Sequence, residues 1–130
     1  MSKTWRIILI TTIFAALLLS ACTQKADLPA AAIEAYWKAL ASKDNAAVSS
    51  LSCAEYEAIA VSTMDSFLSV DLELSDLICS STNNTGDKAD VTCTGSLTAS
   101  YGAEKFDFDL SNKIFIATNS TGDWLMCGEK

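Results

Sequence analysis

The chain has 130 residues, of which 50% are apolar and 19% are charged, as expected for one globular domain. Nine basic and 16 acidic residues give a formal net charge of −7. Two of the basic residues, Lys3 and Arg6, lie in the first six positions, so the rest of the chain is more acidic still. Nucleic acids and anionic lipid surfaces attract basic proteins, and this balance argues against simple electrostatic binding to either.

An apolar segment at residues 7–19 follows a short basic start. A helix that spans a bilayer needs about 20 residues, so this segment is typical of a secretory signal. The segment ends in Leu19-Ser20-Ala21-Cys22, which resembles a bacterial lipobox. The resemblance implies a lipoprotein signal peptide at residues 1–21, lipidation of Cys22 and a lipidated tether at residues 22–27. The alternative is an ordinary signal peptide with a chance cysteine.

A lipoprotein anchor would fix the location of the protein. Two or three acyl chains hold a protein at a membrane far better than one, so we expect an exported protein bound to the cell envelope. Thr23, rather than Asp, follows Cys22. In Gram-negative lipoproteins this resembles the class sent to the outer membrane.

Helical patterns fill the next part of the chain. Pro29 suits a first helical turn capped at Asp27 or Leu28, and Asp44 predicts a second, short helix. Residues 52–55 read S-x-x-E, a capping-box pattern that predicts the start of a third helix reaching about residue 69. Three-four spacing predicts an apolar face on this third helix, made of Tyr56, Ile59, Ala60, Thr63, Met64, Phe67 and Leu68.

Beyond the helices the apolar pattern alternates, which indicates strands. We expect a strand at residues 72–78 with an irregularity at 76–77, a second at 91–101, a third running unbroken over 106–116, and a short fourth at 124–127. Turn-rich links join them, so we expect a four-stranded antiparallel meander with one buried face. Helices followed by strands predict the α+β class.

The stretches AAIEAYWKALASKDNAAVSSL and TGDWLMCG, with this order of elements, resemble the nuclear transport factor two-like (cystatin-like) superfamily. More narrowly, they resemble its small bacterial lipoproteins. The resemblance implies one domain at residues 28–130, in which N-terminal helices pack on a curved, cone-like sheet. The open end of such a cone can hold a small ligand, and sheets of this superfamily often form homodimers.

Four cysteines remain after Cys22. In an oxidising compartment an even number predicts disulfides, and the absence of CxxC and of histidine argues against zinc or redox chemistry. Cys79 and Cys93 flank one hairpin loop, which favours pairing them and leaves Cys53 with Cys127. Pairing Cys53 with Cys79 and Cys93 with Cys127 stays open.

No catalytic motif is visible, and a chain without histidine excludes histidine-based acid–base catalysis. Asp65 and Asp76 are the carboxylates nearest to apolar faces, and Asp107 and Asp109 form a DxD pattern that we expect to be solvated. We therefore expect no cofactor, no metal and no nucleic-acid partner. The main hypothesis is an envelope lipoprotein that binds a small apolar ligand or another envelope protein. The alternative is an isomerase- or dehydratase-like enzyme that uses carboxylates and tyrosine.

Aromatic side chains supply the bulk of either a core or a pocket. Trp37 and Met64 belong to this apolar set. The residues that we predict as a possible pocket lining are Tyr36, Tyr56, Phe67, Tyr101, Phe106, Phe108 and Trp124.

Overall fold

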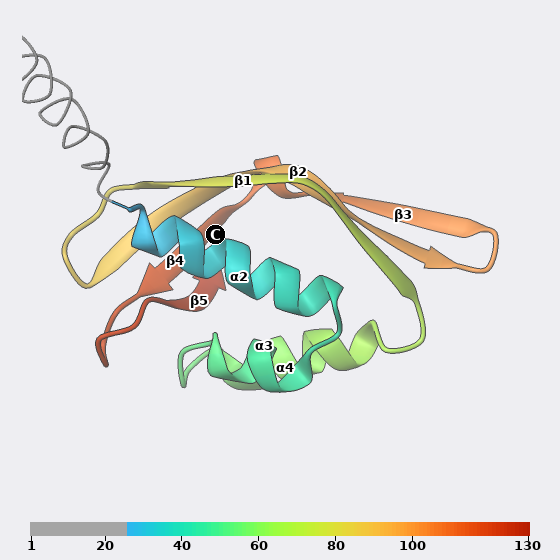
Figure 1. Ribbon diagram of the computed structural model, residues 1–130, viewed down its shortest axis with the longest axis horizontal. Coiled ribbons are helices and arrows are strands. Elements are labelled where there is room, and N and C mark those ends of the chain that lie inside the picture. Colours follow the sequence, from blue (N-terminus) through green and yellow to red (C-terminus); the bar gives the residue numbers. More distant parts are fainter. Residues whose placement is uncertain (1–25) are drawn as a thin grey trace, which may run out of the picture.

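The computed structural model describes residues 26–130, so the predicted signal peptide, Cys22 and most of the tether lie outside the described residues. Helices come first in the described part, and strands follow (Figure 1). The α+β class is confirmed, but the sheet has five strands, not four. The helices are α2 (Leu28–Ala41), α3 (Asn45–Ser50) and α4 (Glu57–Ser66). The strands are β1 (Asp71–Thr82), β2 (Lys88–Tyr101), β3 (Glu104–Asp109), β4 (Ile114–Thr118) and β5 (Leu125–Glu129). A 3-10 turn, η1 (Leu110–Asn112), lies between β3 and β4.

The sheet is antiparallel and is organised around β2. On one side β2 pairs with β1, and on the other side it pairs with two strands in succession. Its first half, from Lys88 to Thr92, pairs with β4, and its second half, from Ser96 to Tyr101, pairs with β3. The chain therefore returns to β2 after β3, which a simple meander does not do. The hairpin of β2 and β3 extends away from the rest of the sheet (Figure 1).

The single strand predicted over residues 106–116 is wrong. The Asp109 carboxylate accepts hydrogen bonds from the backbone amide and the hydroxyl of Ser111, and this cap starts the turn η1. The turn buries Leu110 and shifts the alternation by one residue. Phe115 is consequently buried, whereas an unbroken alternation from Phe106 would have buried Ile114, which is 36% exposed.

Two of the predicted helix starts are confirmed. Asp27 and Asp44 each accept a hydrogen bond from the backbone amide three residues later, at Ala30 and Ala47. The predicted capping box is wrong, because α4 begins only at Glu57 and has no side-chain cap.

The segment with the capping-box pattern is engaged elsewhere. The backbone amide of Cys53 donates to the Met126 carbonyl of β5, and the Ser52 hydroxyl donates to the Val48 carbonyl of α3. The helix also ends earlier than expected, at Ser66. Two residues of its predicted apolar face, Ile59 and Leu68, are more than half exposed, at 56% and 57%.

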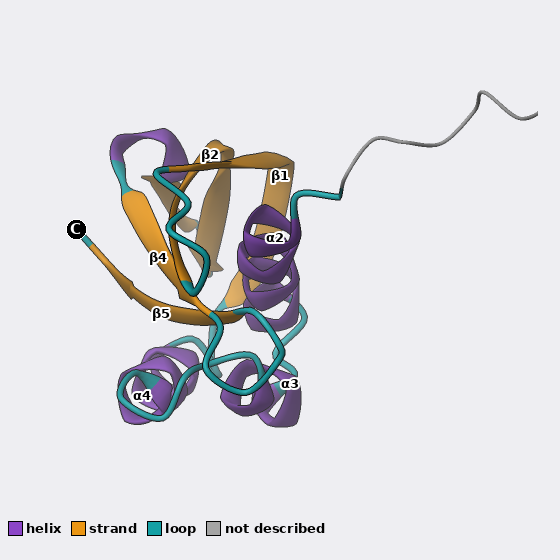
Figure 2. Cartoon of the chain, turned by 90° about the vertical axis from the view of Figure 1, so that its left-hand side faces the viewer, coloured by secondary structure: helices purple, strands orange, loops and turns teal. Residues whose placement is uncertain are grey.

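Helix α2 holds the central position among the helices. It contacts β1, β2, β4 and β5, and the strands curve beside it (Figure 2). Ile33, Tyr36 and Leu40 of this helix are fully buried. Two carboxylates attach α2 to β1: Asp27 accepts from the backbone amide of Ser81 at 2.8 Å, and Glu34 accepts from that of Cys79 at 3.0 Å.

Two disulfides join segments that are distant in sequence. Cys53, between α3 and α4, is bonded to Cys127 of β5, with Cα atoms 5.2 Å apart. Cys79 of β1 is bonded to Cys93 of β2, directly opposite in the strand register, with Cα atoms 4.0 Å apart. This is the pairing that the hairpin layout favoured.

The predicted irregularity in β1 is confirmed. The register between β1 and β2 shifts between Ser75 and Ile78, and Asp76 adopts a positive φ of 54°. Gly95 of β2 lies against this bulge with φ +101°, and a Cβ atom there would lie 2.5 Å from the Ser75 carbonyl oxygen. Only glycine fits this position without a shift of the backbone.

We predict that Gly95→Ala lowers the free energy of unfolding by about 3 kcal/mol, because it combines a strained φ with overlap against the bulge. The matched control is Gly86→Ala, where φ is +99° but no atom lies within 4 Å of the added Cβ. This control should cost only about 1 kcal/mol. Urea denaturation compares the two variants, and equal losses would show that the contact with the bulge is unimportant.

Candidate functional site

A cavity of about 250 Å³ lies between helices α2 and α4 on one side and the second half of β2 with strand β3 on the other. We call it the aromatic pocket, because five of its lining residues are aromatic. It is lined by Tyr36, Trp37, Tyr56, Ile59, Thr63, Phe67, Leu97, Phe108, Asp109, Leu110, Lys113 and Glu129.

Helix α2 and the segment before α4 supply the inner wall of the aromatic pocket. The rings of Tyr36 and Trp37 meet edge to face with centroids 5.7 Å apart, and those of Tyr36 and Tyr56 are 6.3 Å apart. Trp37 in turn contacts the buried Phe115 of β4 at 5.4 Å. The backbone amide of Tyr56 donates to the carbonyl of Cys53, so the disulfide to β5 helps to position this ring.

The outer wall comes from the end of α4 and from β3. Phe67 follows the last residue of α4, and its ring meets that of Phe108 edge to face at 6.0 Å. Phe108 pairs across the strands with Leu97 of β2, which is buried. Phe108 itself is 46% exposed, so this wall borders on solvent.

Charged groups sit at the edge of the aromatic pocket. The Lys113 ammonium and the Glu129 carboxylate form an ion pair at 2.6 Å. Asp109 also lines the pocket, and its carboxylate accepts hydrogen bonds from Ser111 and Asn112. The hydrogen bonds from Ser111 hold the pKa of Asp109 below its usual value, so this carboxylate is ionised at neutral pH.

The two phenol groups of the inner wall remain protonated. Burial raises the pKa of Tyr36, and the neighbouring Tyr56 and the Glu129 carboxylate add to this effect. Burial also raises the pKa of Tyr56, against the opposing effect of its hydrogen bond with Tyr36. Both hydroxyls are therefore neutral hydrogen-bonding groups across the physiological range, not bases.

Four of the seven predicted pocket residues come together here, namely Tyr36, Tyr56, Phe67 and Phe108. The other three predicted residues do not line this pocket. Tyr101 and Phe106 lie exposed on the hairpin of β2 and β3, at 64% and 56%. Trp124 lines a separate, more open depression of about 310 Å³ beside α2 and α3.

The sequence patterns did not indicate the ion pair of the site, and they singled out Asp109 only as part of the DxD pattern. Lys113 and Glu129 are 16 residues apart, and no local pattern links them. Asp109 had a usable signal, because an aspartate followed by Leu-Ser-Asn is typical of a capped turn.

The candidate carboxylates of the enzyme hypothesis lie elsewhere. Asp65 and Asp76 are exposed, and neither lines the aromatic pocket. In the DxD pattern, Asp107 accepts a hydrogen bond from Thr98 at 2.6 Å, whereas Asp109 caps η1. Both acids are thus engaged in local hydrogen bonds.

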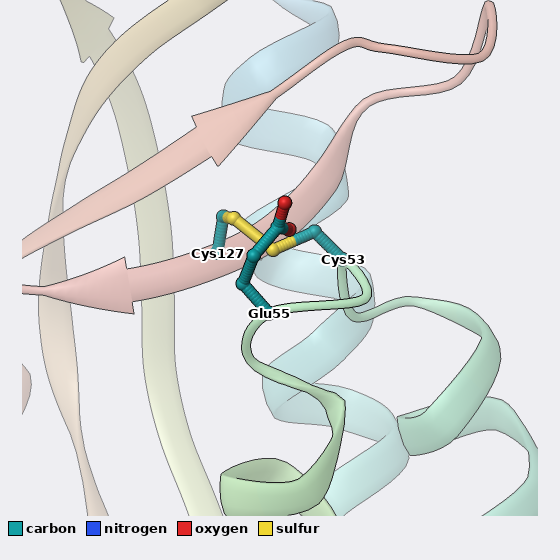
Figure 3. Close-up of side chains that lie close together, drawn as sticks. All are labelled: Cys53, Glu55 and Cys127. Atoms are coloured by element: carbon teal, nitrogen blue, oxygen red, sulfur yellow. A yellow bond between two sulfur atoms is a disulfide. The ribbon is translucent and has the colours of Figure 1, made fainter.

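One cluster has the residue types of a metal site. Ligand atoms of Cys53, Glu55 and Cys127 lie within 4.8 Å of one another (Figure 3). Both sulfur atoms are joined in the disulfide, which leaves the Glu55 carboxylate as the ionisable group of the three. A disulfide supplies no thiolate ligand for a metal ion. The two sulfur atoms lie close together because they are bonded to each other, and their proximity does not indicate a metal site.

Among residues 26–130, no helix is both long and apolar enough to cross a membrane.

No protein-family model and no curated protein matches the chain. It is similar to the solution structure of a SEC-C motif containing protein from Rhodopseudomonas palustris, with a TM-score of 0.55 and 13% identity over 83% of this chain and 81% of that chain. It is also similar to the helical cell shape determining protein Pgp2 from Campylobacter jejuni, with a TM-score of 0.50 and 15% identity over 77% of this chain. The match spans only 38% of Pgp2. At these identities the likeness concerns the fold alone.

We predict that stability falls as the pH rises above about 10, the usual pKa of tyrosine in an unfolded chain. The folded state disfavours the phenolate at Tyr36 and Tyr56, so it binds protons that the unfolded chain releases. Tyr36→Phe should flatten this alkaline loss, measured as the urea midpoint against pH. An alkaline loss in Tyr36→Phe as steep as that of the unmodified protein would contradict the assignment.

Proposed function

We propose that this protein is a lipid-anchored protein of the bacterial cell envelope, and that its domain binds a small, largely apolar ligand in the aromatic pocket. The observation that carries the binding role is the pocket itself. Four separate segments of the chain contribute aromatic rings to one cavity of about 250 Å³. Binding sites for small molecules are typically apolar cavities with a few polar groups, and here the phenols and charged edge supply those groups.

The location rests on the sequence before the domain. The lipobox-like Leu19-Ser20-Ala21-Cys22 follows an apolar segment too short to span a bilayer. Two disulfides in the domain suit an oxidising compartment outside the cytoplasm. The outer membrane is the proposed destination if the source is Gram-negative.

We also propose that the domain is nuclear transport factor two-like. Three features support this assignment: the order of helices and strands, the bend that β1 and β2 share (Figure 1), and the position of α2 beside the curved sheet. A homodimer through the sheet remains a prediction. The enzyme alternative has less support than the binding role, because Asp65 and Asp76 do not line the aromatic pocket.

For the anchor, we predict that Cys22→Ala leaves an unprocessed, unlipidated precursor, because the thiol is the acceptor of the lipid. Mass spectrometry of the purified protein and metabolic labelling with a fatty acid measure this. The matched control is Cys79→Ala together with Cys93→Ala, which removes a disulfide but should leave lipidation intact. Normal lipid incorporation in the Cys22 variant would contradict the lipobox interpretation.

For the pocket, we predict that toluene shifts the indole NMR signal of Trp37 in a saturable way and leaves that of Trp124 unchanged. Trp37 lines the aromatic pocket, whereas Trp124 lies in the separate depression. Phe108→Ala should weaken binding about tenfold, because one ring of the wall is lost.

Phe106→Ala is the matched control for Phe108→Ala, since Phe106 lies two residues away on the same strand but outside the pocket. This variant should bind toluene like the unmodified protein. Equal shifts at both tryptophans, or equal effects of the two substitutions, would contradict a role for the aromatic pocket in binding.

A further inference from the structure

We infer that the ligand of the aromatic pocket is a small soluble organic cation, such as a methylated ammonium compound. This inference rests on the proposed binding function and names the chemical class of the ligand. It combines two features of the cavity, its aromatic walls and the sign of its charge.

The walls present aromatic rings from two sides. Tyr36, Trp37 and Tyr56 form the inner wall, and Phe67 with Phe108 forms the outer wall. Ring faces carry negative charge density, and a cation close to them gains about 0.5–2 kcal/mol per favourable contact. Sites for quaternary ammonium groups are commonly built in this way, from several rings around one methylated cation.

The charge of the pocket has the complementary sign. The residues in its lining that carry a formal charge are Asp109, Glu129 and Lys113, which gives an excess of one negative charge. The ammonium of Lys113 is neutralised by Glu129 at 2.6 Å, so Asp109 remains as the carboxylate without an ionic partner in the lining. An anionic ligand would meet repulsion here and in the acidic chain as a whole.

A soluble ligand fits this cavity better than a lipid headgroup. About 250 Å³ accommodates a methylated ammonium group with a short substituent. A phospholipid headgroup would bring a phosphate into this net negative lining, where like charges repel. A neutral apolar ligand would fit the walls but would gain nothing from the excess negative charge.

The test compares choline with its neutral isostere 3,3-dimethylbutan-1-ol, which has the same shape without the charge. Both are titrated into the full chain, reconstituted in nanodiscs of uncharged galactolipid, and the indole signal of Trp37 reports binding. We expect choline to bind about tenfold more tightly than the alcohol. Phosphocholine, which adds a phosphate to the same cation, should bind more weakly than choline.

The decisive variant is Phe108→Leu, which keeps an apolar side chain and removes the ring. It should weaken choline binding about tenfold and leave the binding of 3,3-dimethylbutan-1-ol nearly unchanged. Phe106→Leu, on the exposed hairpin, should alter neither. An unchanged Trp124 signal in each variant verifies that the domain is folded.

The outcomes separate this inference from the proposed function. Equal affinity for choline and its isostere, or a preference for the isostere, would overturn the cation inference and leave the binding function standing. Tighter binding of phosphocholine would also overturn it and would favour a lipid headgroup. If neither choline, its isostere nor toluene moves the Trp37 signal, both proposals fail.

Discussion

The attachment of α2 to the free edge of β1 is the constraint on which the arrangement of the site depends. Cys79 and Ser81 are two residues apart on β1, so their backbone amides point to the same side, away from β2. The carboxylates of Glu34 and Asp27 accept from these two amides. Partial burial tends to raise the pKa of Asp27, but its hydrogen bonds from Ser81 and Ala30 lower it, so the attachment persists at neutral pH. The edge strand is thereby covered, and the aromatic residues of α2 are held beside the sheet.

The outer wall of the aromatic pocket depends on two interruptions of regular structure. At Gly95 and Asp76 the paired strands β1 and β2 shift register around a bulge, and bulges bend strands. At Asp109 the chain leaves β3 for a single turn and then returns to β2 as β4. Phe108 is the last apolar residue before this turn, so it lies where the hairpin leaves the core and can contact Phe67 of the helical layer.

Sequence patterns were sufficient where the governing interaction is local. Asp27 and Asp44 act on amides three residues away, and the half-cysteines of the hairpin lie in direct register, so spacing alone pointed to them. The break at Asp109 was missed because the apolar alternation on both sides has the same period, and only the phase changes across the turn. A capped turn inside an alternating sequence can be recognised only if its capping residues are given more weight than the apolar alternation.

The aromatic pocket could be predicted only in part, because local patterns do not show which side chains meet in the folded chain. Aromatic residues could be identified as candidates, but Phe106 and Phe108 have the same local pattern, and only the position along the hairpin separates an exposed ring from a pocket ring. The charged edge was out of reach, because Lys113 and Glu129 meet only after β4 and β5 have formed. Tertiary contacts therefore decide which of the aromatic residues act together.

The most direct test of this account is a nuclear Overhauser measurement on the full chain with bound choline. We expect contacts from the choline methyl protons to ring protons of both walls, at Trp37 and at Phe108. Contacts confined to Tyr101 and Phe106 on the hairpin, or to Trp124, would contradict it and would place ligand binding outside the aromatic pocket.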